Sequence, residues 1–446
     1  MLFLILLIGV LLVVIATTKF KLHPFLSLIL GTFFVGIASG MPLMKIVENV
    51  NTGFGGLMGG IGLVIVFGTI IGTILEKSGA ALRMAEVVLR VVGPKRPQLA
   101  MSMIGYIVSI PVFCDSGFVI LSSLRKALAK RAKVAVASMS VALATGLYAT
   151  HTLVPPTPGP IAAAGNIGAN GFLGTIIIIG LIVAIPATIA GYLWAVKVAD
   201  KIEVQDDGEE LNYDEIVSSF GKMPSTFLSF LPIVLPIVLI GIGSIVTYQG
   251  AKGDIANFFL FLGSPLVALL AGVIAAFFLL PKYNEETMTK WVGEALLDAA
   301  PILLITGAGG AFGGVIKNTG IADIIQSWSL GDIFSGALFL LIPFLIAAAL
   351  KTAQGSSTAA LVITSSLIAP MLPGLGIEGA VPLALVVMAI GAGAMTVSHV
   401  NDSFYWVVTE FTGMKVTDAY KAQTMATLLQ GVVTIVFTMI LWVILV

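Results

Sequence analysis

Long apolar segments recur along the whole chain, and they constrain its fold more than any other feature. They fall at about 1–18, 23–40, 57–75, 98–124, 134–165, 171–198, 226–247, 257–280, 295–316, 335–372, 380–412 and 424–446. A helix of about 20 apolar residues crosses the hydrocarbon core of a bilayer. Lipid offers no hydrogen bonds to the backbone, so such segments must be helical. The pattern predicts an all-α polytopic membrane protein whose surroundings are a lipid bilayer.

Composition excludes several other classes. Hydrophobic residues make up 58% of the chain and charged residues only 10%, whereas about a quarter of the residues in a soluble domain are charged. The formal net charge is zero, which argues against nucleic acid as a partner. A single cysteine, Cys114, excludes a disulfide framework and a multi-cysteine metal site, and we expect it to be a small apolar core residue. We expect no metal ion and no cofactor.

One acidic, polar stretch from Asp200 to Pro224 divides the chain into halves of similar size. We therefore expect a first repeat at 1–199, a linker at 200–224 and a second repeat at 225–446. The first apolar segment lacks the basic start and small-residue cleavage site of a signal peptide, and Lys19 and Lys21 follow it. We interpret it as a retained membrane span.

The two halves resemble each other in sequence. Gly68, Gly72 and Gly79 recur 241 residues later as Gly309, Gly313 and Gly320. At the same offset, the polar break at 113–120 falls on 354–361, and shortly afterwards His151 corresponds to His399. Internal repeats of this kind are typical of secondary transporters.

Basic residues predict the topology of the first half. Arg90, Lys95 and Arg96 precede the segment at 98–124, and Arg125, Lys126, Lys130, Arg131 and Lys133 follow it. The positive-inside rule places both flanks in the cytoplasm. We therefore expect a re-entrant hairpin at about 98–128 that turns at Cys114–Gly117.

The other spans of the first half are odd in number, so the second half must be inverted. We expect two inverted repeats, each with about five spans, one of them broken, and one hairpin. The second hairpin, at about 335–372, would enter from outside and turn near Thr352–Thr358. The linker would be cytoplasmic and both termini would lie outside.

The segment at 134–165 contains the run THTLVPPTPGP, which includes Thr150, His151, Pro156 and Thr157. Its four prolines prevent a regular helix, so we expect a span broken in the middle. Broken helices present unpaired N–H groups, which suit a carboxylate ligand. The alternative is a proline loop at the membrane surface.

The corresponding break in the second half lies within 380–412, at His399, Asn401 and Asp402. An ionisable residue inside a span indicates function, because burying its charge is costly. Asp402 and Asp115 are the best candidates for coupling to an ion, since a buried carboxyl group takes up a proton readily. The alternative for each is a structural helix cap.

Lys351 precedes the second hairpin tip in an apolar neighbourhood, so its ammonium group needs an anion. The candidates are a substrate carboxylate, an acidic side chain, or water reached by snorkelling. Further substrate-binding candidates lie at the two hairpin tips: Ser116, Gly117, Gly355, Ser356, Ser357 and Thr358. Their hydroxyl groups suit a polyhydroxylated ligand, although serine and threonine also serve helix packing in membranes.

Of the three histidines, His151 and His399 lie at the two matched breaks. They could carry a proton or donate to substrate oxygens, or they could tie an unwound loop to a backbone carbonyl group. We expect the third, His23 beside Pro24, to be structural.

At these residues the chain resembles the gluconate:proton symporter family, also called the gluconate permease family, within the ion transporter superfamily. The resembling stretches are VFCDSGFVIL, THTLVPPTPGP, the GSST region after Lys351 and SHVNDSFYW. The resemblance implies proton-coupled uptake of gluconate or a related sugar acid across the bacterial inner membrane. It also implies scaffold and transport parts, two opposed hairpins, a homodimer and an elevator-type movement.

Three positions depart from the family pattern. Thr157 stands where many relatives have a second histidine, and Phe404 where glycine usually precedes an aromatic pair. Asp115 is shorter than the glutamate familiar at the first hairpin tip. These changes leave the transport class intact, but a smaller hydroxy acid such as D-glycerate, or D-serine, becomes an alternative substrate.

We expect a small anionic organic acid to bind between the hairpin tips and the two broken helices. Backbone amides and Lys351 would hold its carboxylate, and Asp115 or Asp402 with His151 or His399 would carry the proton. Sodium is the alternative coupling ion. The rival classes are an intramembrane enzyme, for which no Ser-His or metal-ligand spacing is recognisable, and a channel, which would need a continuous polar pore.

Overall fold

The computed structural model of the chain describes residues 2–93, 96–204, 218, 220, 223–319, 336–400 and 402–446. These residues form helices joined by short loops and contain no strand, which confirms the expected all-α class. Most of the linker predicted at 200–224 lies outside the described residues. Lys95, Gly320 and Asn401 also lie outside them.

The helices of the first half are α1 (Leu2–Thr18), α2 (Pro24–Ala38), α3 (Leu43–Lys77), α4 (Ala80–Val92), α5 (Pro97–Val108), α6 (Cys114–Ile120), α7 (Ser122–Ala132), α8 (Val136–Leu153), α9 (Pro158–Asn166) and α10 (Leu173–Lys197). Those of the second half are α12 (Thr226–Tyr248), α13 (Asp254–Gly263), α14 (Pro265–Phe277), α15 (Trp291–Lys317), α18 (Leu341–Gln354), α19 (Ser357–Ile368), α20 (Ala380–Met395), α21 (Ser403–Thr412), α22 (Val416–Ala419) and α23 (Met425–Leu445).

The 241-residue offset between matching glycines also relates the helices. Moved by this offset, α2, α3 and α8 would occupy 265–279, 284–318 and 377–394. The second half has α14, α15 and α20 at these places. The two halves therefore share an order of helices as well as scattered residues.

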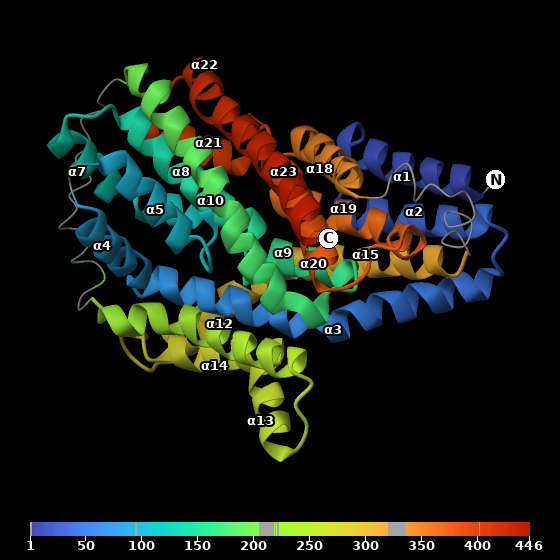
Figure 1. The fold of residues 1–446 in the computed structure, drawn as a ribbon. Helices are drawn as coiled ribbons and strands as arrows, with labels where there is room; N and C mark the ends of the chain where they lie inside the picture. Colours follow the sequence, from blue (N-terminus) through green and yellow to red (C-terminus); the bar gives the residue numbers. More distant parts are fainter. Residues whose placement is uncertain are drawn as a thin grey trace.

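By length and composition, six helical stretches among the described residues can cross a membrane. They contain α3, α10, α12, α15, α18 and α23, and the pair α13–α14, bent by 62°, adds a seventh if it counts as one span. The helices α1, α2, α5, α19 and α20 are apolar but shorter. In Figure 1, α3 runs along most of the molecule, and α12 and α14 lie on the opposite side of it from α10 and α23.

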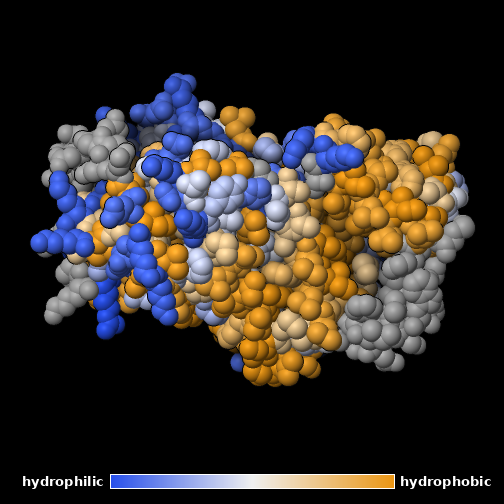
Figure 2. Space-filling view, turned by 90° about the horizontal axis from the view of Figure 1, so that it is seen from above, coloured by the Kyte–Doolittle hydropathy of each residue, from blue (hydrophilic) through white to orange (hydrophobic). Residues whose placement is uncertain are grey.

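The surface supports a membrane setting. Hydrophilic side chains gather at the end of the molecule where α4 and α7 lie, while much of the remaining visible surface is hydrophobic (Figure 2). Exposed large apolar side chains line α10 and α23, among them Ile178, Ile182, Val432 and Val436. A soluble protein rarely exposes so continuous an apolar surface, so this surface faces lipid.

Two sequence predictions about the first half need correction. The span predicted at 57–75 is longer, because α3 starts at Leu43 and the polar residues before 57 are helical. The first hairpin turns at 109–113 and not at Cys114–Gly117, which form the first turn of α6. Ser109 stabilises the turn by donating from its hydroxyl group to the Val112 carbonyl oxygen at 2.8 Å.

The helices that carry the predicted sites pack across the two halves. Helix α6, from the first hairpin, packs on α21, which follows the second break. Helix α19, from the second hairpin, packs on α9, which follows the first break. Each half therefore contributes one hairpin arm to the broken helix of the other half.

Candidate functional site

Both predicted breaks are present. Helix α8 ends at Leu153 and α9 begins at Pro158, so the prolines lie in or just after the break. Proline disfavours helical backbone in the residue before it. It suits the first position of a helix, because it has no N–H group to satisfy. The break therefore follows from the positions of Pro155 and Pro158. It does not lie at the protein surface, because Val154 and Thr157 are both buried.

Glycines let three helices approach this first break closely. A side chain at Gly68 of α3 would place its Cβ atom 2.6 Å from the carbonyl oxygen of Pro156. A Cβ atom at Gly180 of α10 would lie similarly close to the Leu153 carbonyl oxygen. One at Gly391 of α20 would lie similarly close to the Thr152 carbonyl oxygen. The break is therefore enclosed by protein, as non-helical backbone at membrane depth must be.

The second break, between α20 and α21, is held by side chains from the region of α23. The backbone N–H of Ser398 donates to the Thr427 hydroxyl at 3.0 Å, and the Thr424 hydroxyl donates to the Ser398 carbonyl oxygen at 2.6 Å. Asp402 ends the break and caps α21, since its Oδ1 accepts from the Phe404 N–H at 3.2 Å. The predicted capping role of Asp402 is thus realised, but by one carboxylate oxygen only.

The tip of the second hairpin lies at Gly355 and Ser356. Gly355 has a φ of 83°, a conformation that favours glycine, and ends α18. The Ser356 hydroxyl accepts from the Ala359 N–H at 3.2 Å and so caps α19. This turn agrees with the predicted position near Thr352–Thr358.

Lys351 and Asp402 form a buried ion pair where this hairpin meets the second break. Lys351 Nζ lies 2.6 Å from Asp402 Oδ2, and the two side chains are 0% and 5% exposed. Lys351 also donates to the Gly355 carbonyl oxygen at 2.6 Å, and the Ser398 hydroxyl donates to Asp402 Oδ2 at 2.5 Å. An isolated charge at this depth costs several kcal/mol, so each residue supplies the counter-charge that the other requires. Of the predicted partners for Lys351, the acidic side chain is the one present.

Other predicted groups surround this pair. Tyr148 of α8 lies under Lys351, with its ring centroid 5.6 Å from Nζ, and packs on the Phe404 ring. His151 follows one turn later on α8, is buried, and lies near enough to interact electrostatically with Lys351 and Asp402. Asp115, half-buried in the first turn of α6, interacts with Asp402 in the same way.

Two buried polar atoms beside the pair have no hydrogen-bond partner among the described residues. They are the phenol oxygen of Tyr148 and Nδ1 of His151. The Ser357 hydroxyl lies close to Tyr148, but its geometry does not make a hydrogen bond. Unpartnered buried polar atoms are rare in proteins and often mark a place that a ligand or water fills.

His399, in the second break, contacts the end of α18 near the second hairpin tip. Its Nε2 is 2.7 Å from the Thr352 carbonyl oxygen, so it ties the break to the end of α18. This is the structural alternative considered for it in the sequence. His23 is also placed as expected, because its Nδ1 accepts from the Phe25 N–H and caps α2.

The remaining predicted residues lie around this centre or away from it. Thr150 and Thr157 are buried and donate to carbonyl oxygens of their own segments. Pro156 faces α3, and Gly117 packs on Leu147. At the hairpin arms, Ser357 is buried, Thr358 lies beside Gly159, and Ser116 interacts with Glu76.

Sequence reasoning missed Tyr148, Ser398 and Glu76. Tyr148 carries no charge and lies in an apolar run, and Ser398 is the uncharged first residue of the predicted second break, so only their position at the breaks could have indicated them. Glu76 directly follows the apolar segment at 57–75, and no role was expected for it. Helix α3 in fact continues through Lys77, and Glu76 lies beside the first hairpin.

Arg125 was counted among the basic residues that flank the first hairpin on the cytoplasmic side, but burial of its side chain was not expected. Its side chain is fully buried and donates to the Thr412 hydroxyl at 2.9 Å, to the Phe411 carbonyl oxygen at 2.7 Å and to the Ser140 hydroxyl. It therefore joins α7 and α8 to the carboxyl end of α21, where a cation is favourable.

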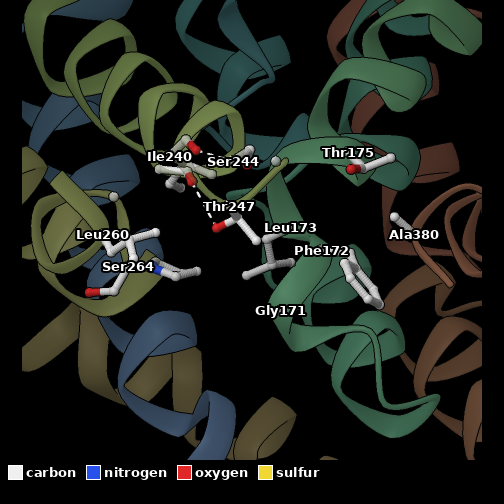
Figure 3. Close-up of a pocket in the computed structure, with 14 residues that line it drawn as sticks. Gly171, Phe172, Leu173, Thr175, Ile240, Ser244, Thr247, Leu260, Ser264 and Ala380 are labelled. Atoms are coloured by element: carbon white, nitrogen blue, oxygen red, sulfur yellow. Dashed lines mark hydrogen bonds between the residues drawn. The ribbon is translucent and has the colours of Figure 1, made fainter. Parts of the chain in front are cut away.

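A cavity of about 330 Å³ lies elsewhere, between α10, α12, the bend of α13–α14 and the start of α20 (Figure 3). Its lining residues carry no charge. Ser244 and Thr247 of α12 donate to carbonyl oxygens of their own helix, so their hydroxyl protons are already used. Neither this cavity nor the smaller one beside Pro156 includes Lys351 or Asp402, so we base the candidate site on the buried polar cluster.

Comparison with known proteins gives consistent results. A family model described as GntP family permease matches residues 1–444. The chain is 31% identical to a gluconate permease of Pseudomonas aeruginosa, over 96% of this chain and 94% of that protein. It is also 31% identical to the D-serine transporter DsdX of Escherichia coli K12, over 98% and 97% of the two chains.

Two solved structures share the fold. The YdaH transporter of Alcanivorax borkumensis superposes with a TM-score of 0.69 at 15% identity, over 94% of this chain and 98% of the other. MtrF of Neisseria gonorrhoeae gives a TM-score of 0.64 at 16% identity, over 91% and 85%. At this level of identity the likeness concerns the fold alone.

Proposed function

Because the chain belongs to the GntP permease family, we propose that this permease imports a small organic acid by proton symport. The protein is a multi-pass protein of the inner membrane and not an enzyme. Proton coupling and inward direction extend this family assignment to a mechanism. Proton coupling is supported by the carboxyl groups of Asp402 and Asp115, which lie where α21 of the second half meets α6 of the first.

The proposed substrate is gluconate or a related hydroxy acid. Relatives of similar identity are named gluconate permeases in three bacteria, while another is named a D-serine transporter. D-Glycerate and D-serine are therefore the alternatives. All three carry a carboxylate with a hydroxyl or amino group on the next carbon, which suits a site with one cation and several hydrogen-bonding side chains.

The proposed transport path lies between the hairpin tips and the broken helices. The two halves act as inverted repeats, with both termini outside and the linker at 200–224 in the cytoplasm. The hairpins and broken helices move together as one transport part against a scaffold, in an elevator-type movement of a homodimer. The packing of α6 on α21 and of α19 on α9 supports this arrangement, because it joins these elements into one body.

One observation carries the proposal: the buried pair of Lys351 and Asp402 at the contact of the second hairpin with the second break. A packing role alone is a poor explanation, because apolar residues of similar size stabilise a buried site as well or better. A cation that can receive a carboxylate, paired with a carboxylate that can receive a proton, is what symport of an acid requires.

Uptake into membrane vesicles that contain the protein tests the substrate assignment. Labelled gluconate is supplied with an excess of unlabelled gluconate, D-glycerate or D-serine. We expect saturable uptake that at least one of the three suppresses. Linear uptake that none of them suppresses would indicate a channel or leak and would contradict the proposal.

A further inference from the structure

We propose that Asp402 occupies, in the substrate-free site, the place of the substrate carboxylate on Lys351, and that Tyr148 and His151 receive the neighbouring hydroxyl group. The inference rests on the proposed function. It assigns a role to Tyr148, and it makes substrate binding conditional on a proton reaching one named carboxylate.

Lys351 already has a partner for each proton of its ammonium group. Its ammonium group has three protons to donate, and it already contacts Asp402, the Gly355 carbonyl oxygen and the face of Tyr148. It is also fully buried. A substrate carboxylate therefore cannot be added to this arrangement and must replace one of the partners. The replaceable anion is Asp402, because it is the partner with the same chemistry.

The net charge of the buried site also limits substrate binding. The pair of Lys351 and Asp402 is neutral as it stands. Adding a substrate anion would leave one net negative charge in a buried site, at a cost of several kcal/mol. A proton on Asp402 removes this cost, because Lys351 and the substrate carboxylate then form the neutral pair. One proton thus accompanies each monovalent anion.

Asp402 has hydrogen-bond partners other than Lys351, which remain after it is protonated. The Ser398 hydroxyl and the Phe404 N–H already contact its two carboxylate oxygens. These contacts can hold the neutral acid in place while Lys351 turns to the substrate. The groups that face Asp402 are Lys351 from α18, Tyr148 and His151 from α8, and Cys114 and Asp115 from α6.

Tyr148 and His151 supply the two unpartnered buried atoms beside the ion pair. Tyr148 and His151 are three residues apart on α8 and so lie on the same face of the helix. The Tyr148 phenol and His151 Nδ1 are buried and bond to no described residue. A 2-hydroxy or 2-amino group next to the bound carboxylate would satisfy both. Tyr148 then has two roles, since its ring supports Lys351 and its hydroxyl selects the substrate.

Binding of labelled gluconate to the purified full chain tests the exchange. For the wild type, we expect the Kd to rise about tenfold per pH unit once Asp402 is charged in the free site. Asp402→Asn mimics the protonated acid, so its Kd should not depend on pH, and gluconate should raise its Tm more than that of the wild type. Glu410→Gln, an exposed change on the same helix, should keep the wild-type profile.

The result that overturns the exchange is specific. If Asp402→Asn keeps the wild-type pH profile while Asp115→Asn flattens it, the proton is carried by Asp115 and the proposal is wrong. Loss of gluconate binding in a folded, monodisperse Asp402→Asn protein would also overturn it. Failure of the proposed function would give another result, because the wild type would then bind none of gluconate, D-glycerate and D-serine. That result would also contradict the exchange of Asp402 for a substrate carboxylate.

Tyr148→Phe tests the second role, because it keeps the ring and removes the hydroxyl group. The wild type should prefer gluconate over 2-deoxygluconate by about tenfold, the worth of one buried hydrogen bond. We expect Tyr148→Phe to lose most of this preference through weaker gluconate binding. Tyr283→Phe, at an exposed position, should retain it. An unchanged preference in Tyr148→Phe would exclude the phenol from the site.

Discussion

At the scale of single residues, Lys351 and Asp402 tolerate burial only as a pair. Removing one partner from a buried ion pair costs about 3–5 kcal/mol, whereas replacing both is often nearly neutral. We expect Lys351→Met and Asp402→Asn each to lower the Tm of the purified, substrate-free protein. The double variant should recover much of this loss and still fail to transport. A double variant as unstable as the sum of the single ones would show that the two residues do not interact.

Arg125 is a second buried cation, and oxygen atoms of α8 and α21 accept hydrogen bonds from its guanidinium group. Its bonds to Thr412 and Phe411 fix the end of α21, the helix that Asp402 begins. Arg125→Gln should therefore lower the thermal stability and reduce transport. Lys133→Gln, an exposed change at the end of the same helix, should have little effect on either measurement. Equal effects of the two substitutions would argue against a structural role of the buried guanidinium group.

At the scale of elements, the two breaks and the two hairpin tips surround the candidate site, and the sequence predicted three of these four positions. Prolines mark the first break, and a polar cluster in an apolar run marks the second. The first hairpin turn was misplaced because Cys114–Gly117 looks like a polar turn. An acidic residue such as Asp115 is also favourable in the first turn of a helix, which is where the structure has it.

Helix α3 offers a matched test of the close packing at the first break. In Gly68→Ala the new Cβ atom would lie 2.6 Å from the Pro156 carbonyl oxygen, so the break or the helix must shift. We expect a lower Tm and reduced uptake. Gly59→Ala, on the same helix in open space, should be neutral or stabilising, since alanine favours helix over glycine by about 1 kcal/mol. A Gly59→Ala protein that is less stable than the Gly68→Ala protein would contradict the packing described.

At the scale of the whole molecule, apolar segments were enough to predict the fold class, since lipid leaves few alternatives to helices. The contacts between halves were not predictable in the same way. Nothing in the sequence around Lys351 selects Asp402 over Asp115 or a substrate as its partner, because the choice depends on how α18 and α21 meet. The buried position of Arg125 was missed for the same reason.

The proposed topology predicts where fusions to the chain emerge. A phosphatase reporter that is active only outside the cytoplasm should work when it is joined after Val446. The same reporter joined after Lys201, at the start of the proposed cytoplasmic linker, should be inactive. Activity at the second junction would reverse the orientation or break the proposed inversion of the halves.

The central claim is that a proton travels with the organic acid. Proteoliposomes containing the purified protein are given labelled gluconate, with an inward proton gradient, an inward sodium gradient or neither. The account predicts accumulation above the external concentration only with the proton gradient, and its loss when a protonophore is added. Accumulation that follows the sodium gradient, or uptake that never exceeds equilibrium under any gradient, would contradict it.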